Sequence, residues 1–372
     1  MCVLPEPHEH ADPSWGPGQR SFAWSSDGSA IALSRNEDGF GRLVVVPLDR
    51  VGDGAPAREV SMGWHAGLDW SPRGIACVRS GGRTAPQVTV VDPTTGDRDA
   101  RARGAPAELD GDLPEPGPIT WPGADGASVH GLLWVPPDVR PGSAPPVLVE
   151  VHGGPTDQTT VDWRPRIRWF LSRGWAVFSP NHRGSTGYGR DYRHALDHAW
   201  GDVDVRDTVA GIRALAHDDR VDATRVAVMG GSAGGFTALL VAAHDPPVVG
   251  AVVSLFGVTD LFDLAATTHR FESRYLDRLV GTLPEAADRY EARSPVTHAR
   301  DIAVPVLVLQ GADDKVVPPA QAKRLVDSLV DAGGTVEYHV YDGEGHGFSQ
   351  EATIVDSFDR IDAFLTRWVV QR

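Results

Sequence analysis

A chain of 372 residues is too long for one ordinary compact domain, since domains usually hold roughly 100–200 residues, so two domains are expected. Apolar residues make up 41% and charged residues 23%, a balance typical of globular proteins, which excludes wholesale disorder. The 35 basic and 50 acidic residues give a net charge of −15. Because so acidic a surface repels phosphate backbones and anionic lipids, we expect no nucleic-acid partner and no membrane-surface partner.

The two cysteines, Cys2 and Cys77, are too few for a secreted disulfide framework and favour a reducing compartment. Residues 1–20 are rich in Pro, His and acidic residues, and they lack the basic start and the apolar stretch of a signal peptide. No apolar run approaches the ~18 residues that cross a bilayer. We therefore expect a cytoplasmic protein in which residues 1–20 form a flexible tail.

Residues 21–103 contain a weak internal repeat. The segment that begins at Phe22 (FAWSSDG) is echoed by the segment that begins at Leu68 (LDWSPRG), and each copy continues into short β-rich runs. The offset from Trp24 to Trp70 is about 46 residues, near the length of one four-stranded propeller blade. A generic β-meander is the alternative. We expect a small all-β domain of two blade-like repeats.

Two blades are too few to close a ring, because propellers need roughly 4–8. Open sheet edges invite pairing with another chain. We therefore expect the blades to lie against the rest of the chain or against a second subunit, which makes a homo-oligomer the favoured assembly.

The stretch 104–118 is dense in Pro, Gly and acidic residues and is predicted to be a linker. From residue 119 to 372, short β-branched runs alternate with helical patterns. The expected strands are 128–135, in an antiparallel edge hairpin, and then 146–151, 175–180, 225–229, 248–254, 305–310 and 336–341. The expected helices are 162–173, 203–217, 233–244, 319–332 and 353–369. This alternation predicts an α/β fold with a doubly wound, mostly parallel sheet.

The segment Gly230–Gly235 (GGSAGG) follows an expected strand and opens an expected helix. Gly-x-Ser-x-Gly in that context is a nucleophile elbow, which needs small residues because its turn is tight and strained. The alternative, a glycine-rich phosphate loop, lacks the Gly-Lys-Ser/Thr sequence that such loops carry. Ser232 is therefore the predicted nucleophile, at the positive end of the helix that follows.

An elbow serine needs an acid and a base, in the chain order Ser, Asp/Glu, His. His346 lies between glycines in a loop after the last expected strand, and it is the predicted base. The loop after strand 305–310 offers two adjacent carboxylates, Asp313 and Asp314. Either could hold the tautomer of His346 and stabilise its imidazolium.

His152-Gly153-Gly154-Pro155 follows strand 146–151, at the place where α/β-hydrolases supply one N–H of the oxyanion hole. We expect the N–H groups of Gly153 and Ala233 to stabilise the developing negative charge, with Gly154 as a third candidate. An ordinary turn is the alternative interpretation of His-Gly-Gly-Pro.

These segments resemble the prolyl oligopeptidase family of serine peptidases, in particular its acylaminoacyl-peptidase and dipeptidyl-peptidase-like branch. The resemblance rests on His152–Pro155, Asn181–Gly189, Trp200–Asp204, Gly230–Gly235, Asp314–Pro318 and Gly343–Gly347, in this order. It covers the whole chain after the linker, and the blades are similar to the tail of that family's propeller. The resemblance implies an α/β-hydrolase fold and a serine hydrolase that cleaves amide bonds in short peptides or N-acylated amino acids.

The resemblance also separates the two adjacent acids. Family members usually carry the catalytic acid three residues after the loop glycine, followed by x-x-Val-Pro, which selects Asp314 and leaves Asp313 as the fallback. The chain departs from the family at Ala233, where Tyr or Asn is common, and at Val316, where an Arg grips a substrate carbonyl. Most of the propeller that screens large substrates is also missing. These departures leave open an esterase, a thioesterase or an acyl transferase that cyclises a small metabolite. A separate alternative is a non-catalytic binding module on a hydrolase scaffold, which the complete set of triad candidates disfavours.

Apolar residues after strand 248–254 and beside the acid are candidates for an acyl-side substrate pocket. They are Phe256, Val258, Leu261, Phe262 and Val317. The alternative is that they are plain core residues. No metal and no organic cofactor is implied, so the expected partner is a small peptide or another small acyl substrate.

Overall fold

The computed structural model describes residues 4, 6–10, 19–50, 57–106, 114–137, 144–244, 249–268, 270 and 272–371. Two compact units are present. One comprises Met1–Gly117, Thr160–Trp169 and Gly187–Gly189, and the other comprises Pro118–Thr159, Phe170–Thr186 and Arg190–Arg372. Among the described residues, no helix combines the length and the apolar composition that a membrane span requires.

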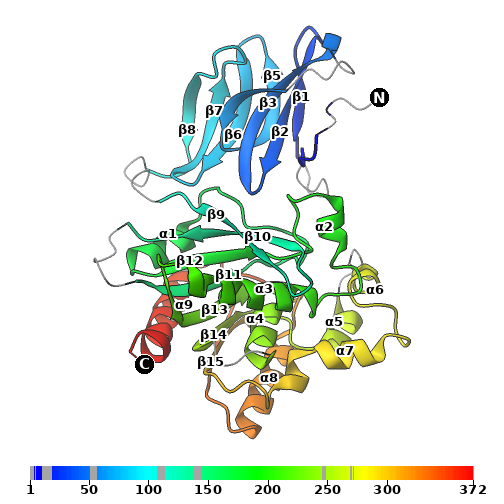
Figure 1. Ribbon diagram of the computed structural model, residues 1–372, viewed down its shortest axis with the longest axis vertical. Helices are drawn as coiled ribbons and strands as arrows, with labels where there is room; N and C mark the ends of the chain where they lie inside the picture. The colour runs from blue at the N-terminus through cyan, green and yellow to red at the C-terminus, as the bar shows by residue number, and fades with distance from the viewer. Residues whose placement is uncertain are drawn as a thin grey trace. The chain divides into compact units, whose positions relative to one another are not determined.

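In its described part, the first unit contains two four-stranded antiparallel sheets (Figure 1). The first sheet consists of β1 (Phe22–Trp24), β2 (Ala30–Glu37), β3 (Phe40–Pro47) and β4 (Arg58–Met62), with a short turn of 3-10 helix at Leu48–Arg50. The second consists of β5 (Trp64–Ser71), β6 (Gly74–Gly81), β7 (Thr84–Val91) and β8 (Arg98–Arg103). Each copy of the sequence repeat forms one sheet: Trp24 pairs with Ile31, and Trp70 pairs with Ile75. The predicted small all-β region is therefore confirmed.

Side chains from both sheets of this unit form one small core. Its buried members are Ala23, Ala32, Leu43, Val45, Val60, Leu68, Ile75, Cys77 and Val91. Along β7, buried and more exposed residues alternate, as expected of a strand that buries one face.

Part of the expected tail packs on this unit, since Glu9 forms a β-bridge with Asn36 and Glu6 lies 3.3 Å from the guanidinium of Arg35. Residues 1–3, 5 and 11–18 of that tail, and 107–113 of the expected linker, lie outside the described residues.

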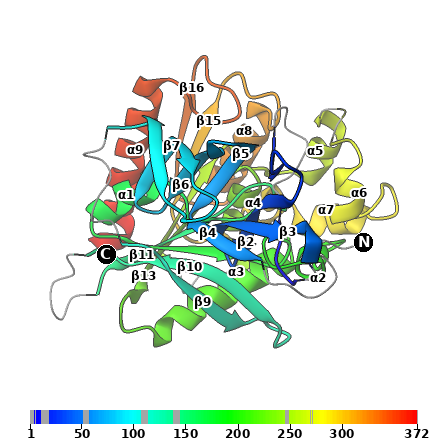
Figure 2. The ribbon, with the colours of Figure 1, turned by 90° about the horizontal axis from the view of Figure 1, so that it is seen from above.

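The second unit is built on an eight-stranded sheet in the order β16-β15-β14-β13-β11-β12-β10-β9 (Figures 1 and 2). The strands are β9 (Gly117–Pro122), β10 (Ser128–Trp134), β11 (Pro146–Val151), β12 (Ala176–Asn181), β13 (Asp222–Gly231), β14 (Ala251–Leu255), β15 (Val306–Gly311) and β16 (Val336–Tyr341). The six strands from β11 to β16 pair in parallel, whereas β10 is antiparallel to β12. The predicted α/β fold with an antiparallel edge is confirmed. Val248, where strand 248–254 was expected to begin, lies outside the described residues.

Helices cover both faces of this sheet. Figure 2 shows α9 (Glu351–Leu365) on one face, and α3 (Val203–Ala214), α4 (Ala233–His244) and α8 (Pro319–Asp331) on the other. Phe170 of α1 (Pro165–Ser172) packs against Phe358 of α9, with ring centroids 6.3 Å apart. Shorter elements, which the sequence did not predict as separate helices, are α2 (Arg190–His194), α5 (Leu261–Thr267), α6 (Tyr275–Leu279), α7 (Ala287–Arg293), two 3-10 turns (Leu215–His217 and Pro295–His298) and a π-helical turn (Thr366–Val370).

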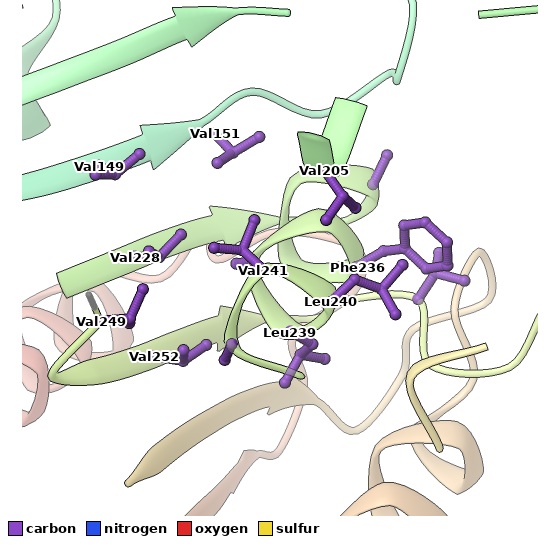
Figure 3. Close-up of a cluster of buried hydrophobic side chains, with 14 of the residues drawn as sticks. Val149, Val151, Val205, Val228, Phe236, Leu239, Leu240, Val241, Val249 and Val252 are labelled. Carbon is purple, nitrogen blue, oxygen red and sulfur yellow. The ribbon is translucent and has the colours of Figure 1, made fainter. Parts of the chain in front are cut away.

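Helix α4 is the centre of the hydrophobic core. Phe236, Leu239 and Leu240 are fully buried, and Figure 3 shows valines of β11, β13 and β14 lying beside this helix. Because α4 is apolar on every side, it can only be stable inside the protein. Its position in turn fixes the position of Ala233, its first residue, and of Ser232 just before it.

Candidate active site

Ser232 lies in the tight turn between β13 and α4, with a backbone φ of 55°. Non-glycine residues rarely adopt this left-handed conformation, which persists only where surrounding contacts enforce it. Here the Ser232 N–H donates to the carbonyl of Leu255 at 3.0 Å, and its carbonyl accepts from the Phe236 N–H at 3.1 Å. The turn therefore has the geometry that the sequence predicted for a nucleophile elbow.

Glycines at two positions make this turn sterically possible. A β-carbon at Gly230 would lie 2.3 Å from the carbonyl carbon of Gly234. A β-carbon at Gly234 would lie 2.2 Å from the carbonyl oxygen of Val151, on the neighbouring strand β11. Any side chain at either position would push the elbow away from the sheet.

The structure brings Ser232, His346 and Asp314 together from three distant parts of the sequence. His346 Nε2 lies 2.9 Å from Ser232 Oγ, and His346 Nδ1 lies 2.8 Å from Asp314 Oδ2. Asp313 is exposed instead, and its N–H donates to the carbonyl of Glu344. Of the two adjacent acids, Asp314 is therefore the one placed against the imidazole.

The carboxylate of Asp314 is completely buried and held by hydrogen bonds. Its Oδ1 accepts from the N–H groups of Val316 and Val317, each at 2.9 Å, and its Oδ2 accepts from the side-chain amide of Gln310 at 3.1 Å. Buried carboxylates need such partners, because an unpaired one is strongly destabilising. Sequence reasoning missed Gln310, although its place at the end of strand β15 could have indicated a residue near the acid.

The aromatic ring of Phe256 packs edge-on against the imidazole of His346, with centroids 5.0 Å apart. A second edge-on contact, at 5.4 Å, joins Phe256 to Phe348. Phe256 itself has a φ of 40°, so its backbone is held in an unusual conformation directly after β14. This residue, expected in the substrate pocket, thus limits how far the His346 ring can rotate.

Glu344 anchors the loop that carries His346. Its side chain is buried and accepts hydrogen bonds from the N–H groups of Ser349 and Gln350, each at 2.9 Å, and from the Ser349 hydroxyl at 3.0 Å. Burial alone would raise the pKa of Glu344, but these hydrogen bonds outweigh burial and hold that pKa below its ordinary value of 4.5. Sequence reasoning missed this role too. The signal was an acidic residue between two glycines, just before the last helix.

Gly153 and Ala233, the predicted oxyanion-hole residues, both border Ser232. A β-carbon at Gly153 would lie 3.8 Å from Ser232 Cβ, and Ala233 is the next residue in the chain. In the described part of the chain, neither N–H donates to a protein acceptor. Both amides are therefore available to a ligand oxygen bound beside Ser232.

The remaining predicted pocket residues lie mostly in the core. Val258, Leu261 and Val317 are at most 3% exposed, which leaves them little surface for contact with a substrate. Phe262 is 40% exposed, and its ring packs against Tyr290 with centroids 5.3 Å apart. For these three buried residues the structure favours the alternative interpretation as core.

The sequence model that describes the prolyl oligopeptidase family matches residues 161–372, which is more than half of the chain. The chain belongs to the prolyl oligopeptidase family. The resemblance stated from the sequence motifs is thereby confirmed.

Two curated members of this family show how far the similarity extends. Dipeptidyl aminopeptidase BIII of Pseudoxanthomonas mexicana is 30% identical over 210 residues, which is 55% of this chain and 30% of that protein. The mouse acylamino-acid-releasing enzyme is 30% identical over 241 residues, which is 62% of this chain and 32% of that protein. Both matches therefore leave most of the relative's length uncovered.

Among solved structures, a puromycin-hydrolyzing peptidase of Mycobacterium tuberculosis is similar with a TM-score of 0.90 and 35% identity. A second structure, a puromycin hydrolase, gives a TM-score of 0.89 and 34% identity. In both cases the match covers 99% of this chain and 56% of the other. This chain thus spans about half the length of these two proteins.

Proposed function

We propose that this protein is a serine hydrolase that cleaves amide bonds in short peptides or N-acylated amino acids through an acyl-enzyme. The observation that carries the proposal is the continuous series of contacts from Ser232 Oγ through the His346 ring to the buried carboxylate of Asp314. A nucleophile, a base and an orienting acid in this arrangement are what acyl transfer requires.

In the first step, Ser232 Oγ attacks the carbonyl carbon of the substrate while His346 Nε2 takes the hydroxyl proton. Asp314 holds the Nδ1–H tautomer of His346 and stabilises the imidazolium that forms. The carbonyl oxygen becomes an oxyanion, which the N–H groups of Gly153 and Ala233 stabilise.

The tetrahedral intermediate then collapses. His346 returns its proton to the leaving amine, the C–N bond breaks, and the acyl group remains on Ser232 as an ester. Water, deprotonated by His346, attacks this ester, the acid product leaves, and Ser232 Oγ recovers its proton.

The substrate class rests on the relatives. The names of the two curated relatives describe a dipeptidyl aminopeptidase and an acylamino-acid-releasing enzyme, and the two solved structures are described as puromycin hydrolases. We therefore expect an amide next to an amino-acid residue as the scissile bond, and puromycin is the first substrate to test.

The test compares wild-type protein and Ser232→Ala on phenylalanine p-nitroanilide, its N-acetyl form, puromycin and p-nitrophenyl acetate. We expect the wild type to hydrolyse at least one amide. Ser232→Ala should lose activity by a factor on the order of 10⁶, while it keeps the wild-type circular dichroism spectrum. A fluorophosphonate should label the wild type and not the variant.

Three results would contradict the proposal in different ways. Activity of Ser232→Ala above about a tenth of the wild type would remove the mechanism, because that loss is too small for a nucleophile. Hydrolysis of the ester alone would indicate an esterase. A wild type that neither reacts with the fluorophosphonate nor turns over any substrate would indicate a binding module.

A further inference from the structure

The loop that carries Gly153 is tied to a second loop, 181–186, for which the mechanism so far has no use. Asn181 Oδ1 accepts from the Thr159 N–H at 2.7 Å, and the Asn181 amide donates to the Thr159 carbonyl at 3.0 Å. The Thr186 N–H donates to the carbonyl of Asp157 at 3.0 Å. These bonds join the far end of loop 152–159 to loop 181–186.

The side chain of His152 makes the connection at the near end. Its Nδ1 lies 2.8 Å from the carbonyl oxygen of Gly153, and its Nε2 lies 2.7 Å from Ser185 Oγ. A carbonyl oxygen only accepts, so Nδ1 must donate. The Ser185 hydroxyl lies equally close to the carbonyl of His182, at 2.7 Å, so its one proton can serve only one of these two contacts at a time. The His152 ring also stacks on that of His182, with centroids 4.7 Å apart.

Loop 181–186 is itself firmly anchored by Arg183. Two of its guanidinium nitrogens donate to the buried carboxylate of Asp207 on α3, at 2.9 and 2.7 Å. A third nitrogen lies 2.6 Å from Asp125, in the turn between β9 and β10. Hydrogen bonds from Arg183 to Asp207 raise the pKa of the guanidinium above its ordinary value, so the anchor keeps its charge.

The consequence lies at Gly153, which is fixed on both sides. On one side, the carbonyl of His152 lies against the elbow, since a β-carbon at Gly234 would be 2.8 Å from that oxygen. On the other side, the His152 ring holds the carbonyl of Gly153. A glycine left unrestrained would rotate freely, whereas an oxyanion hole works only if its donors are oriented before the charge develops.

We propose that His152, braced by Ser185, is a positioning residue that fixes the two peptides flanking Gly153, and with them the N–H groups of Gly153 and Gly154, beside the place where the oxyanion forms. The inference rests on the proposed function, because an oxyanion forms only if Ser232 attacks a carbonyl. On this proposal, residues Asn181–Ser185 contribute to catalysis by supporting His152, without contacting the substrate.

Variants of His152 separate its hydrogen bonds from its ring contact. His152→Phe keeps a ring that can stack on His182 and removes both hydrogen bonds. His152→Asn places an amide near the position of Nδ1 and can restore the bond to Gly153, whereas His152→Gln reaches toward Ser185 only. His217→Phe, at an exposed histidine, is the matched control.

We expect His152→Phe to lower kcat/KM for the amide substrate by a factor on the order of 10², the lower range for loss of one oxyanion donor, with KM changed less than about threefold. The kcat/KM of His152→Asn should be higher than that of His152→Phe, and the kcat/KM of His152→Gln should lie between the two. The inhibition constant of phenylboronic acid, which forms a tetrahedral adduct on Ser232, should rise with the loss in kcat/KM. The inhibition constant of phenylalaninol, which has no carbonyl and therefore forms no oxyanion, should stay unchanged.

A kcat/KM of His152→Phe within about twofold of the wild type would overturn the proposal, and so would equal weakening of the boronate and of phenylalaninol. If His152→Phe does not fold, Ser185→Ala carries the test, with a smaller loss of the same pattern. Each of these comparisons requires a wild-type protein that hydrolyses the amide substrate. A wild type without amidase activity and without fluorophosphonate labelling counts against the proposed function and against the positioning role together.

Discussion

The two units of this protein use β-strands in opposite ways. In the blade-like unit, a strand such as β7 buries alternate residues, so each sheet presents one face to its small core. In the other unit, every residue of β11, β12, β14 and β15 is buried, because helices cover both faces of the sheet. Parallel strands also end at a common edge, where the loops carrying Ser232, Asp314 and His346 meet.

The units also differ in how they treat buried titratable groups. In the blades, burial lowers the pKa of His65 to about 3 and raises the pKa of Cys77 to about 11, so both groups stay neutral near pH 7. In the other unit, buried carboxylates such as Asp314 and Glu344 receive several hydrogen bonds. Around Glu344 these donors outweigh burial and hold the pKa of the carboxyl below its ordinary value, so a buried charge is kept next to the candidate active site.

The largest effect should separate the two adjacent acids. Asp314→Asn should lower kcat by a factor on the order of 10⁴, because the amide favours the wrong tautomer of His346. Asp313→Asn should cost far less, since Asp313 is exposed and does not contact the imidazole. Steady-state kinetics of both variants test this, and the reverse ranking would show that the wrong acid has been assigned.

A matched pair of valines compares the two kinds of strand. Val228, in β13, is completely buried, whereas Val88, in β7, is 45% exposed. Val228→Ala should lower the free energy of unfolding by roughly 2–4 kcal/mol, from lost apolar burial and the cavity it leaves. Val88→Ala should change it by less than about 1 kcal/mol. Urea unfolding of both variants measures this, and equal losses would remove the distinction between one-sided and two-sided burial.

The blades should lose stability in weak acid. Burial lowers the pKa of His65 to about 3 in the folded protein, from a usual value of 6.5. Between pH 6.5 and pH 3, the histidine is therefore protonated in the unfolded chain and neutral in the folded one. Stability should therefore fall as the pH drops from 6.5 toward 3, by about 2 kcal/mol between pH 7 and pH 5. Hydrogen exchange of amides in β5 and β6 reports this local change.

His65→Gln is the control for that prediction. Its amide can keep the hydrogen bond that His65 Nε2 makes with Ser61 Oγ at 3.1 Å, and it does not titrate. The acid-dependent loss of protection should disappear in this variant. An unchanged pH dependence would mean that another group is responsible.

The smallest effect should come from the loop that carries His346. Glu344→Gln replaces one of the two carboxylate oxygens by an NH2 group, so the side chain can no longer accept from the N–H groups of both Ser349 and Gln350. We expect kcat to fall on the order of tenfold through misplacement of His346. Because the pKa of Glu344 is depressed, its contribution to loop stability is present above about pH 4.5 and is lost as the pH falls below that value. Glu351→Gln, at an exposed position in α9, is the control, and an equal loss there would assign the effect to charge alone.

The amino-acid sequence by itself determined the strands from 146 to 341, the longer helices, the blade repeat and the elbow. These features depend on local periodicity and on turn chemistry, so they can be read from neighbouring residues. The order of the motifs also indicated Ser232 and His346, and the resemblance to the family selected Asp314 over Asp313, before any contact between them was known.

Only the tertiary structure decided which side chains support that site. It placed Phe256 against the His346 ring, buried Val258, Leu261 and Val317 in the core, and gave Gln310 and His152 their partners. An apolar residue after a strand has the same local pattern whether it faces a substrate or the core. The contact between His152 and Ser185 joins two loops that follow different strands, so only the packing of those strands in one sheet brings them within hydrogen-bonding distance.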